Sequence, residues 1–308
     1  MFDDGDRSAT GGLRALTLAE FLERKLPPRE FVLDPIIPTQ GLVMLYAKRG
    51  VGKTHLALGI ACAVASGIPV LRWNAPKPRR VLYLDGEMPG TAMQERLRAL
   101  RTAAGGDPPS LDNLRIVTPD LCLDPIPNLA SLEGQAQVEP LLNGVELLVI
   151  DNLATLARFG KENESESWRP IQTWLLDLRR RGISVLLVHH AGKGGQQRGT
   201  SSREDILDTV INLAHPLDYK PTEGARFIVS LDKARGIAGE AASPFEAQLE
   251  LLDGRADWKM SDAADHIGKK IIELKEAGLS LASIGKDVGL SKSEVHRRLE
   301  RTQQQPHA

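Results

Sequence analysis

A glycine-rich turn between an apolar run and an Ala-rich segment constrains the fold of this chain more than any other feature. The stretch "YAKRGVGKTHLALGIACAVASG" runs from Tyr46 to Gly67. The apolar run "GLVMLY" before the turn predicts a buried strand, and the apolar spacing after it predicts a buried helix. Glycine allows positive φ and close approach of a ligand, so backbone N–H groups and the helix N-terminus converge on one point, which suits an anion. The sequence therefore predicts a phosphate-binding loop.

The loop has the pattern Ala-x-x-x-x-Gly-Lys-Thr, with Ala47 in place of the usual first glycine. Lys53 supplies a positive charge for the phosphates, and the Thr54 hydroxyl can reach a metal ion. A glycine-rich turn with an incidental lysine is the alternative, but strand, loop and helix occur here in the right order. We therefore expect a nucleoside triphosphate with Mg²⁺, held by Ala47, Lys48, Arg49, Gly50, Val51, Gly52, Lys53, Thr54 and His55.

Length and composition limit the remaining possibilities. The chain has 308 residues, 42% of them hydrophobic and 26% charged, with a net charge of −1. These values are ordinary for a globular protein of one large domain and one small one, and nothing in bulk demands nucleic acid or a membrane. Cys62 and Cys122 lack metal-ligand spacing, so we expect buried free thiols and a cytoplasmic protein. The longest apolar stretch, Leu56 to Leu71, is too short and interrupted to span a bilayer.

Short apolar runs alternate with helical segments after the loop. The runs are "RRVLYLDGE", "NLRIVTP", "VELLVID" and "ISVLLVHH", and the predicted helices cover Thr91–Arg101, Leu132–Leu142 and Trp168–Arg181. This alternation predicts an α/β fold with a mostly parallel sheet covered by helices on both faces. Three later runs, "ILDTVINL", "ARFIVSLDKARG" and "FEAQLELLDG", are expected to extend the sheet in antiparallel fashion. We expect a flexible segment at 1–27, an ATPase domain at 28–258 and a small all-α domain at 262–302.

The last forty residues have the pattern of a helix-turn-helix. The sequence "ASIGKDVGLS" precedes an arginine-rich helix, with Gly289 placed to allow the turn and Ser291 to cap the following helix. Lys292, Arg297 and Arg298 lie on that last helix and are candidates for nucleic-acid contact. A charged surface helix that binds nothing is the alternative.

Two carboxylates follow predicted strands and are candidates for metal binding and hydrolysis. Asp151 ends "ELLVID", and a parallel strand puts such a carboxylate beside the phosphate loop, where it can hold Mg²⁺ together with Thr54. Hydrolysis needs a second carboxylate to orient the attacking water. Asn152, not an acid, follows Asp151, so Glu87 in "VLYLDGEMPG" is the expected catalytic base; a solvated loop acid is the alternative.

Several cations lie near predicted strand ends. A strand ends in His189 and His190, of which alternation allows only one to face the nucleotide, where it would sense the γ-phosphate. The glycine-rich loop after it carries Lys193 and Arg198, which could contact single-stranded DNA or a neighbouring subunit, or simply be solvated. Lys233 and Arg235 end a later strand, either as surface charge or as an arginine finger delivered across a subunit interface.

Together, "AKRGVGKT", "YLDGE", "LLVIDN", "LVHHAGKGG" with "RGTSS", and "KARG" resemble the RepA-like, DnaB-related branch of the RecA-fold ATPases, over about residues 28–255. The resemblance implies a RecA-like core, ATP with Mg²⁺ at subunit interfaces, and a homo-hexameric ring around single-stranded DNA. By this resemblance Glu87 is the catalytic glutamate, Asp151 the metal aspartate and His190 the histidine before the DNA-side loop. Arg198 matches the finger of RepA-like members, whereas Lys233 and Arg235 match the pair of DnaB-like members, so both finger assignments stay open.

Three functions are compatible with these motifs. The first is an ATP-driven, ring-forming DNA helicase or translocase in replication of a plasmid, phage or other mobile element. The second is an ATPase switch that binds duplex DNA through the helix-turn-helix and regulates without unwinding. The third is an ATPase in recombination or defence. The basic glycine-rich loop favours the first function and the helix-turn-helix the second.

Overall fold

The computed structural model describes residues 15–26, 28, 30–103, 111–158, 164–191, 205–216, 218–288 and 290–303. The chain divides into two units, Met1–Glu30 and Phe31–Ala308. In the first unit, helix α1 (Leu18–Glu23) begins with a capping box, in which Thr17 Oγ1 accepts from the Glu20 backbone N–H and the Glu20 carboxylate accepts from the Thr17 N–H at 2.7 Å. A helix therefore lies inside the segment predicted to be flexible.

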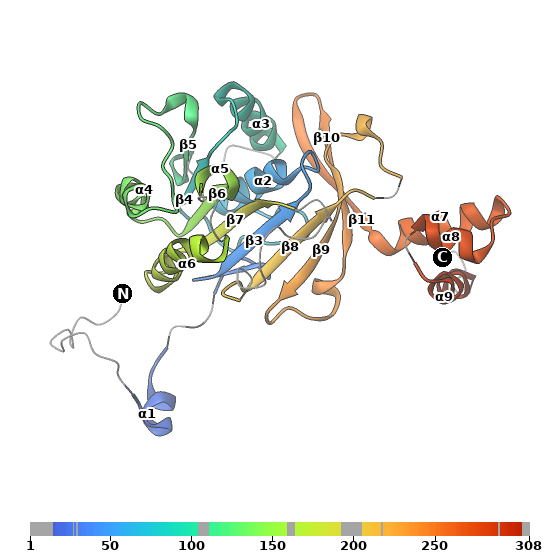
Figure 1. Cartoon of the computed structure of the whole chain (residues 1–308), viewed down its shortest axis with the longest axis horizontal. Helices are drawn as coiled ribbons and strands as arrows, with labels where there is room; N and C mark the ends of the chain where they lie inside the picture. The colour runs from blue at the N-terminus through green and yellow to red at the C-terminus, as the bar shows by residue number, and fades with distance from the viewer. Residues whose placement is uncertain are drawn as a thin grey trace. The chain divides into compact units, whose positions relative to one another are not determined.

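A nine-stranded sheet forms the centre of the second unit (Figure 1). The strands follow the order β11-β10-β9-β8-β3-β7-β6-β4-β5. Their bounds are β3 Leu42–Ala47, β4 Val81–Asp85, β5 Leu114–Val117, β6 Leu147–Asp151, β7 Ser184–His190, β8 Thr209–Ala214, β9 Arg226–Ala234, β10 Phe245–Leu252 and β11 Arg255–Asp262. A separate two-stranded sheet, β1 (Phe31–Leu33) with β2 (Ile37–Pro38), precedes them and was not predicted.

Strand direction is constant across six strands of the large sheet and alternates across the other three. Strands β5, β4, β6, β7, β3 and β8 are parallel, and β9, β10 and β11 are antiparallel to their neighbours. The mostly parallel sheet is confirmed, and so is the antiparallel extension by β9 and β10. The prediction was wrong for β8, which pairs with β3 in parallel, Val43 opposite Thr209. The prediction also missed β11, whose exposed polar face gives "RADWKMSD" little apolar periodicity.

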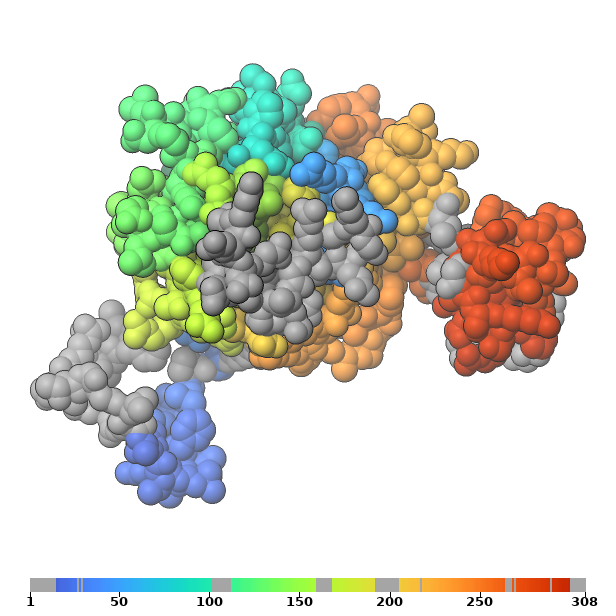
Figure 2. Space-filling view, in the orientation of Figure 1, coloured from blue at the N-terminus to red at the C-terminus, as the bar shows by residue number. Residues whose placement is uncertain are grey.

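Helices cover both faces of the sheet, as expected. Helices α2 (Lys53–Ser66) and α3 (Gly90–Ala103) share a hydrophobic cluster with Val43, Leu45 and Val149. Helices α4 (Leu132–Val138), α5 (Leu153–Leu156) and α6 (Glu164–Arg180) share another with Met44 and Leu148. Neighbouring residues of one strand thus belong to opposite clusters, which is the period-two alternation of a sheet buried on both faces. Figure 2 shows α3 and the segment from β5 to α4, coloured cyan to green, next to each other at the surface.

Short 3₁₀ turns connect several elements. They are η2 Leu111–Asn113, η3 Pro119–Leu121, η4 Glu139–Leu142, η6 Pro221–Glu223 and η7 Gly239–Ala242. The helix predicted over Leu132–Leu142 is thus an α-helix that ends at Val138 and continues as η4, where Pro140 cannot donate an α-helical hydrogen bond. Cys62 and Cys122 are free thiols, half-buried rather than fully buried. In the described part of the chain, no helix is long and apolar enough to cross a bilayer.

Three helices follow β11: α7 (Ala263–Glu276), α8 (Leu281–Val288) and α9 (Lys292–Gln303). They have a hydrophobic cluster of their own, built on the buried side chains of Ile271, Ile284, Val288 and Val295. Ser291 Oγ accepts from the Glu294 N–H at 3.2 Å and so caps α9, as predicted. Gly289 lies outside the described residues. The division into an ATPase domain and a helix-turn-helix domain stays a prediction.

Candidate functional site

The turn after β3 forms the loop that the sequence predicts. Strand β3 ends at Ala47 and helix α2 begins at Lys53. Gly50 and Gly52 have φ values of 81° and 122°, which L side chains rarely adopt. At Gly52 an added Cβ would also lie 2.9 Å from the Phe227 ring, so glycine is required there for both reasons. The backbone of the loop can therefore curl tightly into the first turn of α2.

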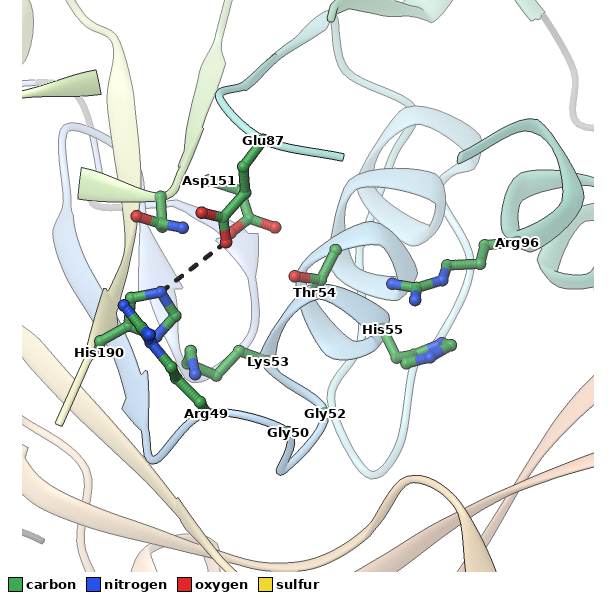
Figure 3. A pocket seen from close by; sticks show the side chains of 11 residues that line it. Arg49, Gly50, Gly52, Lys53, Thr54, His55, Glu87, Arg96, Asp151 and His190 are labelled. Atoms are coloured by element: carbon green, nitrogen blue, oxygen red, sulfur yellow. Dashed lines mark ion pairs between the residues drawn. The ribbon is translucent and has the colours of Figure 1, made fainter. Parts of the chain in front are cut away.

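A cavity of about 500 Å³ opens above this loop (Figure 3). The loop, the start of α2, the ends of three parallel strands and helix α3 contribute to its wall. The lining residues are Arg49, Gly50, Gly52, Lys53, Thr54, His55, Glu87, Arg96, Asp151, Asn152 and His190. Of the predicted loop residues, Ala47 and Val51 are buried below the cavity and Lys48 is exposed outside it.

Lys53 brings a buried positive charge to the cavity. Its Nζ donates to the carbonyl oxygens of Ala47 at 3.1 Å and Lys48 at 2.9 Å. Burial lowers the pKa of Lys53, against the opposing effect of the Asp151 and Glu87 carboxylates. The ammonium thus lies folded back on its own loop, where phosphate oxygens could replace the two carbonyls.

Asp151 lies at the end of β6 and is 3% exposed. The hydroxyls of Tyr83 and Thr54 both donate to its carboxylate, the former at 2.7 Å. Burial raises the pKa of Asp151 in spite of these hydrogen bonds. A carboxylate and a hydroxyl side by side are oxygen ligands of the kind that a hard divalent cation prefers, so Thr54 and Asp151 could hold one here.

Glu87 lies just past the end of β4, on a turn that Asp85 holds. The buried Asp85 carboxylate accepts from the Met88 N–H at 2.9 Å. Burial raises the pKa of Asp85 to about 6. The Glu87 side chain is 53% exposed and its Oε1 lies 3.8 Å from His190 Nε2. Glu87 therefore reaches the cavity from a rigid turn, with a free path to solvent water.

The two histidines that end β7 point to opposite faces, as strand alternation predicts. His190 lines the cavity, and His189 is 6% exposed and does not line it. His190 is therefore the histidine that a ligand in the cavity would meet. Strand alternation predicted that only one of the two would face the nucleotide.

A family model for an AAA domain, AAA_25, matches residues 9–196, which is more than half of the chain. The chain belongs to this AAA-domain family. The matched region includes the loop, Glu87, Asp151 and His190. A solved structure of a KaiC-like protein from the hyperthermophilic archaeon Pyrococcus horikoshii OT3 is also similar, with a TM-score of 0.48 and 18% identity over 74% of this chain and 93% of that chain. The AAA domain described here has a RecA-like α/β fold with a P-loop, flanked by β9–β11 and α7–α9.

Two predicted cations of this AAA-domain protein lie away from the cavity, and two others fall outside the described residues. Lys233 and Arg235 lie at and beyond the end of β9, and neither lines it. Arg235 is exposed and its guanidinium donates to the Asp205 carbonyl oxygen at 3.0 Å. Lys193 and Arg198 lie outside the described residues.

The predicted nucleic-acid contacts of α9 lie on the C-terminal helices. Lys292 and Arg297 are exposed and Arg298 is half-buried. Arg297 pairs with Glu294 at 2.6 Å, one turn away on the same helix. The structure neither brings these residues to the cavity nor tests their contact with DNA.

Two lining residues of the AAA domain were missed as site residues. Arg96 comes from α3, where "QERLRALR" looks like an ordinary amphipathic helix. From the sequence, Asn152 served only to show that no acid follows Asp151. In the structure its side-chain oxygen accepts from the N–H groups of Ala154 and Thr155 and so caps the start of α5. Capping residues were a usable signal for Asn152, but no local signal marked Arg96.

Proposed function

We propose that this P-loop NTPase is a ring-forming ATPase that moves along single-stranded DNA as a helicase or translocase. The single observation that carries the proposal is the composition of the cavity. A water-orienting carboxylate, Glu87, and a loop lysine, Lys53, line it together with Arg49 and Arg96, whereas neither of the late-strand cations, Lys233 and Arg235, lies on the part of its wall that the structure describes. A finger role for either late-strand cation therefore needs a neighbouring copy, as in a ring.

The residues present fit ATP and Mg²⁺. Thr54 and Asp151 would hold the ion, which when bound neutralises phosphate charge. The Lys53 ammonium turns from its two backbone carbonyls to the β- and γ-phosphate oxygens. A water oxygen attacks the γ-phosphorus, the bond to the bridging oxygen of ADP breaks, and Glu87 accepts the proton that the water loses.

His190 lies between the proposed catalytic base and the segment that follows β7. Its Nε2 lies 3.8 Å from Glu87 Oε1, so one imidazole faces both the base and the expected position of the γ-phosphate. The glycine-rich loop that follows contains Lys193 and Arg198. We infer that loss of the γ-phosphate is passed through His190 to this loop, and that the loop holds single-stranded DNA. Such a motor would act in the cytoplasm on a plasmid, phage or other mobile element.

A second function, the switch that binds duplex DNA without unwinding, is favoured by the C-terminal helices. Helices α8 and α9 have the cap and the buried residues of a helix-turn-helix, and α9 exposes Lys292 and Arg297. In this function ATP controls assembly on a duplex site, and single-stranded DNA has no effect on turnover.

One experiment separates the two functions. ATP turnover and mass in solution are measured with and without single-stranded DNA. The motor predicts that turnover rises with single-stranded DNA and that the ATP-bound protein has the mass of a ring. A monomer whose turnover ignores single-stranded DNA would overturn the motor and leave the switch.

The interface needs its own test. Lys53→Ala should abolish turnover, because it removes the charge on the β- and γ-phosphates. A finger acts on the transition state, so Arg198→Ala or Arg235→Ala should lower turnover ~10³-fold or more with little change in ATP affinity. Mixing the finger variant with Lys53→Ala should restore activity at mixed interfaces. Normal turnover in both arginine variants contradicts a finger at either position.

A further inference from the structure

Arg96 is the one lining residue that helix α3 contributes to the cavity within the described chain. The helix begins three residues after Glu87, yet Arg96 returns to the cavity two turns later. In Figure 3 its guanidinium projects toward Thr54 and His55 at the start of α2. The side chain is half-buried, so the wall of the cavity already fixes its approach.

The position of Arg96 is opposite to the hydrolytic end of the cavity. Glu87 and His190, 3.8 Å apart, mark the end where the γ-phosphate is expected. Figure 3 shows Lys53 at the same end as that pair, and Thr54 between this end and the side where His55 and Arg96 lie. A phosphate chain that starts at Glu87 and passes Lys53 and Thr54 therefore reaches Arg96 with its innermost phosphate, the one next to the ribose.

On this side of the cavity Arg96 lies beside His55. Arginine stays charged and its planar group can donate two hydrogen bonds to phosphate oxygens. An anion on this side would therefore meet a permanent cation.

We propose that Arg96 binds the α-phosphate of the nucleotide and so holds ADP as firmly as ATP. This inference rests on the ATPase part of the proposed function but not on DNA or on ring formation. Arg96 then has a different task from Lys53: Lys53 distinguishes the triphosphate, and Arg96 retains the nucleotide after hydrolysis. The residue is a binding group rather than a catalytic one.

A purely structural role for Arg96 makes different predictions. Its charge also acts on Tyr83, which donates to Asp151, so Arg96 could serve only to stabilise that buried pair. In that case its removal would lower the stability of the nucleotide-free protein. It would weaken ligand binding only through Asp151, and therefore only when a divalent cation is present.

The test compares Arg96→Gln with Arg98→Gln. Arg98 lies on the same helix, is exposed, bonds to Gln94 and does not line the cavity, so it is the matched control. Dissociation constants of ATP and ADP are measured for the full chain with Mg²⁺ and with a chelator. We expect Arg96→Gln to raise the dissociation constants of ATP and ADP by the same factor, roughly tenfold or more, because a charge-assisted hydrogen bond is lost. The factor should be the same with and without Mg²⁺. Arg98→Gln should change neither.

The outcomes separate cleanly. Unchanged ADP affinity in Arg96→Gln overturns the proposal, and so does weakening seen only with Mg²⁺ together with a lower melting temperature of the nucleotide-free protein. Arg96→Lys, which keeps the charge, should recover part of the affinity and guards against a variant that does not fold. A wild-type chain that binds neither nucleotide would instead refute the ATPase function itself.

Discussion

The cavity and the C-terminal helices differ in how their key residues are brought into place. The cavity collects residues from the loop after β3 and from α2, from the ends of β4, β6 and β7, and from α3. In α8 and α9 the corresponding contacts are local: Ser280 caps α8 through Ser283, and Ser291 caps α9 through Glu294. The comparison teaches that the chemistry depends on long-range strand pairing, whereas the helical region depends on contacts a few residues apart.

Their interiors differ as well. The cavity rests on buried ionisable groups, Lys53, Asp85 and Asp151, whose pKa values burial shifts toward the neutral forms. The interior of α7–α9 is apolar, with four buried side chains at its centre. Burying a charge destabilises the folded state, whereas burying an aliphatic group stabilises it. The buried groups of the cavity therefore lower the stability of the fold, and those of α7–α9 raise it.

The largest effect is expected at Glu87. Glu87→Gln removes the group that accepts the proton but keeps its size, so ATP binding should persist while turnover falls ~10²–10⁴-fold. Glu95→Gln, an exposed acid on α3, is the control and should be silent. Single-turnover hydrolysis and nucleotide binding are the measurements. Near-normal turnover would contradict Glu87 as the catalytic base and would leave Asp85 or Asp151 as the candidate.

The next prediction tests whether the C-terminal helices are independent of the cavity. Ile284→Ala removes a fully buried side chain of α8 and should destabilise α7–α9 by about 2–5 kcal/mol, with ATP turnover unchanged. Hydrogen exchange of the α7–α9 amides in the full chain reports the loss. Ile272→Ala, half-buried and outside the cluster, is the control. If turnover falls together with protection, the helices belong to the main domain or to the interface between copies.

A third effect concerns the cost of a buried acid beside the cavity. Because burial raises the pKa of Asp85 from 3.8 to about 6, the native state keeps the proton that the unfolded state releases. The stability that protonated Asp85 contributes is therefore present below pH 4 and is lost as pH rises to about 6. Asn does not titrate and can still accept from Met88.

Asp85→Asn should consequently gain stability relative to wild type between pH 4 and 6, by up to about 3 kcal/mol, and keep that difference above pH 6. Urea unfolding of the nucleotide-free protein across this range measures it. Asp124→Asn, at an exposed position, is the control. Parallel curves for wild type and Asp85→Asn would show that Asp85 titrates normally.

The smallest effect is at a helix cap. Ser291→Ala removes the acceptor for the Glu294 N–H and should destabilise α9 by about 1 kcal/mol. Lys292→Ala, at an exposed position on the same turn, leaves that bond in place and serves as the control. Exchange rates in α9 test the difference. Equal rates in the two variants would mean that packing, not the cap, fixes the start of α9.

Much of the parallel half of the sheet could be predicted from the sequence. Strands β3, β4, β6 and β7 are built on continuous apolar runs, because both faces of the sheet are covered there, and the glycines at positions 50 and 52 follow a pattern that serves phosphate binding. The Ser291 cap was equally readable, since a cap acts over three residues. Sequence patterns of this kind succeed where the cause of a structure is local.

Other features were decided by the tertiary structure. Nothing local in "ILDTVINL" makes β8 run parallel to β3; the pairing with a strand some 166 residues earlier sets its direction, where Asp208 accepts from the Leu42 N–H. The alternation at His189 and His190 allowed only one of them to reach the cavity and did not say which; the family resemblance selected His190, and the packing of β7 places that residue on the cavity wall.

The sequence by itself determined that this chain has a P-loop between a strand and a helix, with Glu87 and Asp151 at strand ends beside it. Only the tertiary structure brought Arg96 into the same cavity, since a helix face has no fixed neighbour until it packs on a sheet. The physical reason is range: torsional preferences, caps and apolar periodicity act within a few residues, whereas convergence of charges depends on which strands pair.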